Sequence, residues 1–191
     1  MVSDNMSRSL KKRAVIVVVT AMLGSVGLVT STSSAMPSVG GIFHTMSEED
    51  VRTVMRQPWV AIASDGGAIN LQASGFPHPR AYSTNARVLG YYVREQHVLS
   101  LEDAVRKMTS LPAQILGLED RGQLHPGFAA DVVLFDPAKV GETNSYEKPK
   151  SYPAGIPWVI VNGQVVLKKG QYTSARPGKA ILGKGYKPAT E

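Results

Sequence analysis

The chain has 191 residues, a hydrophobic fraction of 43%, a formal net charge of +6 and no cysteine. This length fits one domain, or one domain with an appendage. The absence of cysteine excludes disulfides and thiolate metal ligands, so a metal ion would have to be held by carboxylates and by the four histidines.

The positive charge lies at the two ends of the chain. Residues 1–35 carry four basic residues and one acidic residue, a net charge of +3. Residues 168–191 carry six basic residues and one acidic residue, a net charge of +5, which leaves −2 for the central part. A nucleic-acid-binding domain more often carries a basic stripe on its folded body. We therefore expect no nucleic-acid partner.

The N-terminus has the order of segments found in a secretory signal. The basic stretch Ser7–Arg13 precedes the uncharged run Ala14–Thr30, and Ser33 and Ala35 are then suitably placed for a signal peptidase. We predict that residues 1–35 are a signal peptide and that the chain is exported to the periplasm or the cell exterior. The apolar run of 17 residues leaves an uncleaved anchor, in which this run contacts the membrane, as the alternative.

Residues 36–120 alternate between strand and helix patterns. Gly41–His44 is a short candidate strand, and Ser47 with the acids that follow it has the pattern of a helix N-cap. Pro58 closes this helix. Trp59–Ser64 is an apolar run without polar alternation, which is typical of a strand covered on both faces in a parallel sheet.

Two further helices are predicted after a loop that runs from Asp65 to about Arg80. A helical pattern covers Thr84–Gln96, and a second helix begins after a cap at Ser100 and continues through Leu111–Leu116. The order strand, helix, strand, helix predicts βα units of a parallel sheet.

The pattern changes to β structure after residue 121. Residues 122–136, GQLHPGFAADVVLFD, predict a strand, a Pro-Gly turn and a second strand. Residues 158–167, WVIVNGQVVL, predict a hairpin around Asn-Gly. The polar segment 137–157 between them is predicted to be a long surface loop, and residues 173–191 a basic tail.

Asp65 and Arg80 are the candidate site residues. Asp65 ends an apolar run and precedes two glycines, so it is either an ordinary turn residue or a carboxylate at the mouth of a (β/α) barrel. Arg80 follows a proline and could form a fork for a substrate carboxylate, with an ordinary surface arginine as the alternative.

The positions of three of the histidines favour a structural or solvent-facing role over metal binding. His44, His97 and His125 are scattered along the chain, and no two of them have the short spacing of a paired metal ligand.

Four segments together resemble the C-terminal part of N-acyl-D-amino-acid deacylases of the amidohydrolase superfamily. They are SDGG, HPRAYSTNARVLGYYVRE, LSLEDAVRKMTSLPAQILGL and DRGQLHPGFAADVVLFDP. The pattern GxLxPGxxADVVLFD is shared widely in that superfamily, whereas HPR with RVLGYYVRE is typical of the D-aminoacylase branch. The similarity covers about residues 42–182.

The resemblance implies zinc-dependent hydrolysis of the amide bond of N-acyl-D-amino acids on a TIM barrel with a small β-sandwich. It implies an α/β fold in which residues 36–120 are the last two βα units of a truncated barrel and residues 121–172 the C-terminal strands of the sandwich. Asp65 matches the general base beside the metal site, and it would be the one metal ligand that this chain supplies. Arg80 matches the arginine that holds the substrate carboxylate.

The sequence departs from the family at the metal site. It contains neither a His-x-His pair nor a cysteine, and zinc needs about three protein ligands. We therefore expect a fragment that binds no zinc and is inactive alone. The alternatives are a non-enzymatic exported binding module on the same scaffold, and one half of a split hydrolase whose zinc ligands come from a complementing chain.

Export can be tested without reference to the family. We expect N-terminal sequencing of the mature chain to begin near Met36, or the chain to remain with the membrane fraction. Recovery of the full-length chain in the soluble cytosolic fraction would contradict both outcomes.

Overall fold

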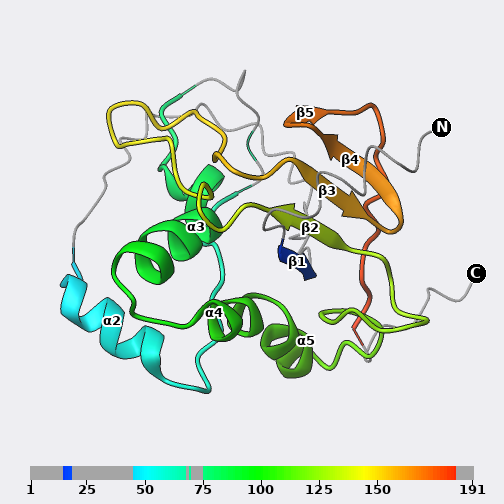
Figure 1. Ribbon diagram of the computed structural model, residues 1–191, viewed down its shortest axis with the longest axis horizontal. Coiled ribbons are helices and arrows are strands. Elements are labelled where there is room, and N and C mark those ends of the chain that lie inside the picture. The colour runs from blue at the N-terminus through cyan, green and yellow to red at the C-terminus, as the bar shows by residue number, and fades with distance from the viewer. Residues whose placement is uncertain (1–14, 19–44, 68, 70–74, 184–191) are drawn as a thin grey trace, which may run out of the picture.

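The computed structural model describes residues 15–18, 45–67, 69 and 75–183. Figure 1 shows the helices gathered on one side and a five-stranded sheet on the other. The predicted strand Gly41–His44 lies outside these residues. Within them, no helix has both the length and the apolar character needed to cross a membrane.

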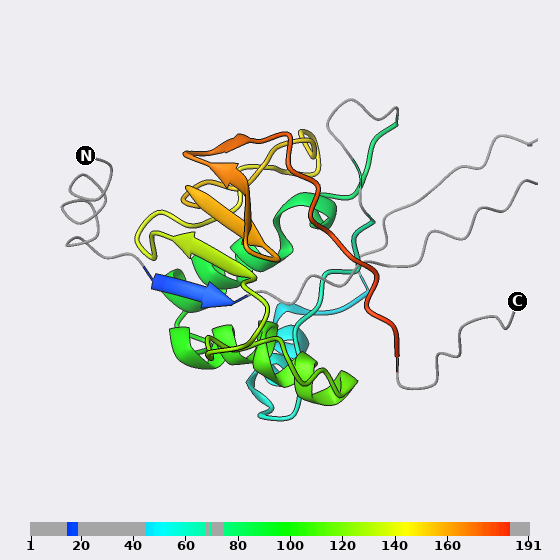
Figure 2. The same cartoon turned by 90° about the vertical axis from the view of Figure 1, so that its right-hand side faces the viewer.

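The described elements are five helical segments and five strands. The helical segments are α2 (Glu48–Arg56), α3 (Arg80–Arg87), the π-helix η1 (Val88–Glu95), α4 (Leu101–Met108) and α5 (Ser110–Leu116). The strands are β1 (Val15–Val18), β2 (Val132–Phe135), β3 (Trp158–Val161), β4 (Gln164–Lys168) and β5 (Gln171–Tyr172). Each strand pairs antiparallel with the next, and Figure 2 shows them in this order from blue β1 to β5. The mixed α/β class is confirmed, and the truncated barrel stays a prediction.

Local capping signals set the predicted helix starts. The hydroxyl of Ser47 accepts a hydrogen bond from the Asp50 N–H at 3.1 Å, and the Asp50 carboxylate accepts one from the Ser47 N–H at 3.3 Å. Ser100 caps α4 through one such bond, in which its hydroxyl accepts from the Asp103 N–H at 3.1 Å. These contacts satisfy donors that a helix start leaves without an intrahelical partner, so both predicted starts are confirmed.

The helix predicted over Thr84–Gln96 begins earlier and changes type. α3 starts at Arg80, and from Val88 the helix continues as η1. A Cβ on Gly90 would lie 2.7 Å from the carbonyl oxygen of Val140, so the absence of a side chain permits the close approach of the two segments.

The prediction that Trp59–Ser64 forms a strand is wrong. A parallel strand needs ladder partners on its neighbours, and no strand among the described residues pairs with this segment. Its end is instead held by α4. The Ile62 N–H donates to the Lys107 carbonyl at 2.9 Å, and the buried Lys107 ammonium donates to the carbonyls of Gln57 and, at 3.1 Å, Val60.

The predicted β segment is confirmed in two of its parts and corrected in the third. β2 forms as expected, and the β3–β4 hairpin turns at Asn162 and Gly163, whose φ values of 44° and 78° fit the two positions of a type I′ turn. Gly122 and the residues after it form no strand. A Cβ on Gly122 would lie 2.7 Å from the Ala113 Cβ, so this segment lies against α5.

Asp131 ties the hairpin to the preceding loop. Its side chain is buried, forms an ion pair with Arg121 and accepts a hydrogen bond from the Asn162 N–H at 2.7 Å. Arg121 also donates to the Asn162 side-chain oxygen at 2.9 Å. This cluster satisfies buried polar groups at the turn and gives the ADVV segment a structural role.

Four residues of the predicted signal segment belong to the sheet. In β1, Val15 pairs with Phe135 and Val18 pairs with Val132, at the edge opposite β5. The rest of the Ala14–Thr30 run lies outside the described residues. Export therefore stays a prediction.

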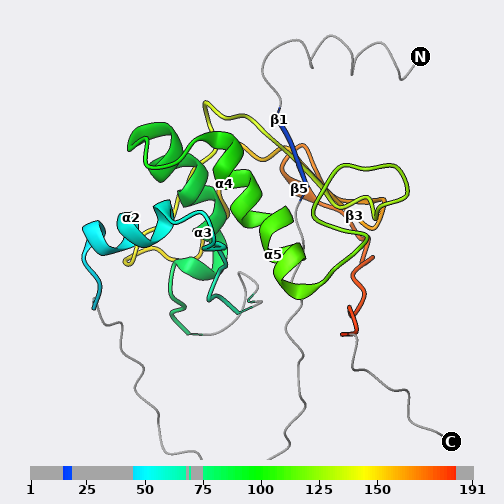
Figure 3. The same cartoon turned by 90° about the horizontal axis from the view of Figure 1, so that it is seen from below.

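The core joins the helices to the sheet. Figure 3 shows the helices packed along one side of the strands. The buried side chains of the core come from α3–η1, the turn after η1, α4, β2 and the loop that follows β2. They are Ala86, Val88, Leu89, Tyr92, Val98, Leu99, Ala104, Met108, Phe135 and Val140. Segment 137–157 was predicted to be a surface loop, but Val140 and Asn144 are buried in it. That prediction is corrected, because Gly90 lets the loop pack directly on the helix.

Candidate functional site

The structure brings the two predicted site residues together. The Arg80 Nη2 lies 3.0 Å from the Asp65 Oδ2, and the two side chains are 46% and 88% exposed. An ion pair this exposed contributes about 0–1 kcal/mol to stability. Both side chains therefore remain available to a ligand.

Gly66 permits the approach of Asp65 to the start of α3. A Cβ at this position would lie 2.6 Å from the Ala81 Cα, a distance that real Cβ atoms do not reach. Ser64 fixes the same contact, because its hydroxyl donates to the Arg80 carbonyl at 3.1 Å and accepts from the Gly66 N–H at 3.2 Å. The glycine after Asp65 is thus needed for close packing.

The backbone before Arg80 is held from both sides. The Arg80 N–H donates to the His78 Nδ1 at 3.0 Å, and the buried Asn144 amide donates to the Pro79 carbonyl at 2.9 Å. The Ser83 hydroxyl donates to the Asn144 side-chain oxygen. These contacts fix the position of the Arg80 backbone while its guanidinium stays exposed.

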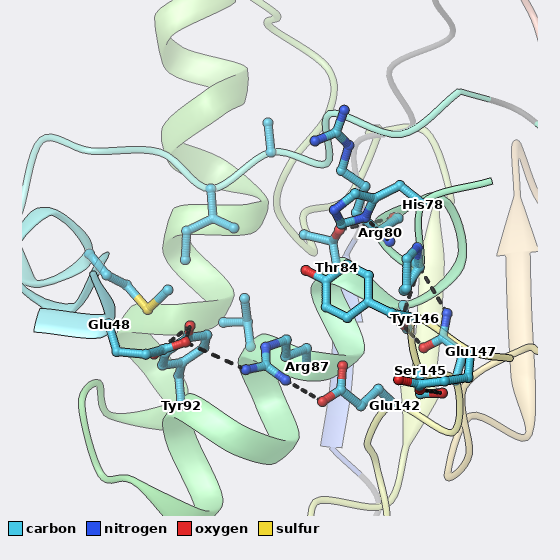
Figure 4. Close-up of a pocket in the computed structure, with 17 residues that line it drawn as sticks. Glu48, His78, Arg80, Thr84, Arg87, Tyr92, Glu142, Ser145, Tyr146 and Glu147 are labelled. Atoms are coloured by element: carbon cyan, nitrogen blue, oxygen red, sulfur yellow. Dashed lines mark hydrogen bonds and ion pairs between the residues drawn. The ribbon is translucent and has the colours of Figure 1, made fainter. Parts of the chain in front are cut away.

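Arg80 lines a pocket of about 670 Å³. Its wall comes from α2, from residues 62–63, from the face of α3–η1 that carries Arg80, and from residues 142–147 (Figure 4). This volume is in the range of pockets that bind small molecules. Asp65 lies outside the residues that line this pocket and contacts them through its ion pair with Arg80.

Arg87 is bound on several sides in the same pocket. Its guanidinium pairs with Glu142 and lies 3.8 Å from Glu48, as Figure 4 shows. It also lies over the rings of Tyr91 and Tyr92, at 4.5 Å and 5.6 Å from their centroids. The Tyr92 hydroxyl donates to Glu48 at 3.1 Å. Arg87 therefore joins α2, η1 and the 137–157 loop.

This network shifts two pKa values. Partial burial alone would lower the pKa of Arg87, but the charge of Glu142 and the contact with Tyr92 outweigh it, so the pKa is raised. Burial raises the pKa of Tyr92, and the negative charge of Glu48 raises it further, while the charge of Arg87 opposes both effects.

The described residues do not fit a zinc site. They contain no group of three or more His, Cys, Asp or Glu side chains that could hold a metal ion, and Asp65 is paired with a cation instead. His44 lies outside the described residues. His97 lies exposed after η1, and His125 lies in the Pro-Gly turn with its ring 5.0 Å from that of Phe128.

Sequence reasoning did not identify Arg87, Glu142 or Asn144 as parts of the site. Arg87 opens the RVLGYYVRE segment that carries the family resemblance, and that was the available signal. Glu142 and Asn144 lie in a polar segment without a motif, and their contacts with α3 span 55 and 61 residues of chain.

A match to a family model, described as "Amidohydrolase family", covers residues 15–167. The chain therefore belongs to the amidohydrolase family.

Several relatives within the family are deacylases of N-acyl-D-amino acids. The chain is 41% identical to an N-acyl-D-glutamate deacylase and 42% identical to a D-aminoacylase, both from Alcaligenes xylosoxydans xylosoxydans. These matches cover 80% and 74% of this chain but only 30% and 28% of the relatives. The predicted resemblance to this group is confirmed, and the chain spans about three tenths of the length of these relatives.

A solved structure supports the same relationship. The N-acyl-D-glutamate deacylase from Bordetella bronchiseptica, in complex with zinc and a phosphonate inhibitor that mimics the tetrahedral intermediate, matches with a TM-score of 0.59 and 42% identity. The match covers 63% of this chain and 25% of that chain. The fold of the described residues is therefore an amidohydrolase fold.

The pKa of Tyr92 reports on the Arg87 network. Glu48→Gln removes a charge that disfavours the phenolate, so we expect the pKa of Tyr92 to fall toward its ordinary value of about 10. Because a raised folded pKa stabilises the protein at neutral pH and this stability is lost as tyrosine ionises, the variant should lose less stability above about pH 10. A phenolate absorbance titration, with Tyr92→Phe to assign the signal, measures the shift. Glu49→Gln is the control on the same helix, and an equal shift there would contradict the assignment.

Proposed function

We propose that this chain is an exported part of a zinc-dependent hydrolase of N-acyl-D-amino acids, and that it is inactive alone. Arg80 binds the substrate carboxylate, and Asp65 serves as an acid–base group beside it. Export is supported by the basic and apolar pattern of residues 1–35, and the substrate class by the deacylase relatives. The meeting of Asp65 and Arg80 at a pocket is the observation that carries the proposal.

Arg80 suits a carboxylate ligand because its backbone is fixed and its guanidinium is exposed. Its partner Asp65 is 88% exposed, so water can solvate Asp65 when the ion pair opens. An incoming carboxylate can form two parallel hydrogen bonds with a guanidinium. A ligand carboxylate can therefore take the place of Asp65 at the Arg80 guanidinium at little cost in free energy. The released Asp65 then lies beside the bound substrate.

Hydrolysis is not assigned to this chain alone. A zinc hydrolase needs about three protein ligands with an open position, and the described residues supply no such set. The sequence adds neither a His-x-His pair nor a cysteine. The first proposal is therefore a fragment that lacks the zinc ligands and is inactive alone.

The second candidate, one half of a split hydrolase, is favoured by exposed apolar side chains. Trp59 and Phe76 are each 69% exposed, and Val54 is 46% exposed. Trp59 lies in the turn that precedes residues 60–64, a segment with no strand partner among the described residues, and Val54 comes earlier on α2. A complementing barrel segment would cover such a surface and pair with this backbone.

Carboxylate binding can be measured without metal. We expect Arg80→Gln to weaken binding of an N-acetyl-D-amino acid at least tenfold, because the ion pair with the ligand is lost. Asp65→Asn should tighten binding about twofold to fivefold, because it removes a competitor worth about 1 kcal/mol or less. Calorimetry on the full chain measures both.

Arg56→Gln, an exposed arginine on α2, is the matched control and should leave the affinity unchanged. If Arg80→Gln and Arg56→Gln have the same effect, Arg80 is not the binding group.

Activity separates the candidate functions. The purified chain with zinc and an N-acyl-D-amino acid should show no hydrolysis above background. Addition of the part of the related D-aminoacylase that lies outside the match should restore zinc-dependent hydrolysis if the chain is half of a split enzyme. Asp65→Asn should then abolish it, because general acid–base groups contribute about 10²–10⁴-fold.

Two results would change this assignment. Turnover by the chain alone would contradict inactivity. Ligand binding that never leads to hydrolysis with the added segment would favour the non-enzymatic binding module.

A further inference from the structure

We infer that the pocket selects N-acyl-D-amino acids with neutral or basic side chains and rejects those with acidic side chains. This inference rests on the proposed function, in which Arg80 holds the α-carboxylate. Sequence identity does not decide the question, because the chain is 41% identical to an N-acyl-D-glutamate deacylase and 42% identical to a D-aminoacylase.

The charged residues on the pocket wall give the pocket a negative potential. Glu48, Glu142 and Glu147 line it together with Arg80 and Arg87, which gives a net charge of −1. Asp65, joined to Arg80, brings the local charge to −2. A second carboxylate on the ligand would enter this field.

Among the described residues that line the pocket, Arg87 is the remaining arginine that could attract an acidic side chain, since Arg80 is used by the α-carboxylate. Arg87 is already paired with Glu142 and lies near Glu48, with one face over the Tyr91 ring. An acidic ligand would have to displace a protein carboxylate that is only one-third exposed. The other wall carboxylate, Glu147, accepts a hydrogen bond from the Ser145 hydroxyl at 2.7 Å, which lowers its pKa and keeps it charged.

The two arginines lie on the same wall of the pocket, so a ligand held at Arg80 can reach these carboxylates where it extends along that wall. Arg80 and Arg87 are seven residues apart on a continuous helix, which is about two turns or 10 Å along its axis. Both line the pocket, and Figure 4 shows Glu142 beside Arg87. A side chain that extends from a carboxylate held at Arg80 toward Arg87 therefore approaches Glu142 and Glu147.

A matched pair of ligands tests the inference. N-acetyl-D-glutamine and N-acetyl-D-glutamate have nearly the same shape and differ in one charge. Repulsion from a nearby carboxylate in a partly hydrated pocket corresponds to about threefold in affinity. We expect the full chain to bind the glutamine ligand at least threefold more tightly at low ionic strength, by calorimetry.

Glu142→Gln should remove the preference, because it releases Arg87 for the side-chain carboxylate of the ligand. We expect it to strengthen binding of N-acetyl-D-glutamate at least threefold and to leave N-acetyl-D-glutamine within about twofold. Glu49→Gln, on α2 outside the pocket wall, should change neither affinity.

A salt series on the unaltered chain gives a result that does not depend on the folding of a variant. The ratio of the two affinities should approach one as salt screens the repulsion, whereas a preference caused by shape would persist.

The outcomes separate the two proposals. Failure to bind either ligand would overturn the proposed function and this inference together. Binding of both ligands, with N-acetyl-D-glutamate equal or tighter in the unaltered chain, would overturn the selectivity alone, as would a preference that salt does not change.

Discussion

The close packing of helix α3–η1 on the 137–157 loop is the constraint on which the rest of the structure depends. It requires glycine at position 90, where a Cβ would lie 2.7 Å from the Val140 carbonyl. Arg94 then donates to the carbonyls of Val140 and, at 3.3 Å, Pro137. These bonds satisfy backbone groups that the packing removes from water, so an irregular segment can be buried without a large free-energy penalty.

The same packing determines the chemistry of the pocket. Once Val140 is fixed on η1, the following residues run back along α3, where Glu142 meets Arg87 and Asn144 meets the Pro79 carbonyl. The loop therefore fixes the backbone that carries Arg80 and neutralises Arg87, two turns away. One arginine of the helix stays exposed for a ligand, and the other becomes a structural cation. The difference comes from the loop, because both residues are arginines on the same wall.

Signals confined to a few residues predicted much of this structure, and contacts between distant residues account for what was missed. The caps at Ser47 and Ser100 and the Asn162–Gly163 turn depend on neighbouring residues, so their sequence patterns were sufficient. Asp65 and Arg80 received site roles only through the family resemblance, and their ion pair was not predicted. The run from Trp59 to Ser64 was predicted to be a strand because its residues are apolar. An apolar composition indicates that a segment tends to be buried, but it cannot show whether neighbouring strands are present to pair with it. The neutralisation of Arg87 by Glu142, 55 residues later, leaves no local pattern.

The Asp65–Arg80 ion pair links ligand binding to the state of the aspartate. Without a ligand, Arg80 holds Asp65 at 3.0 Å, and the pair is weak because both side chains are solvated. In the proposed function, a carboxylate ligand would compete for the same guanidinium, and its arrival would release Asp65 beside the bound ligand. In the proposed function an acid–base group must contact the substrate and must not remain tied to a cation. Competition for one arginine meets both requirements, and Gly66 permits it by letting the aspartate loop lie against the start of the helix.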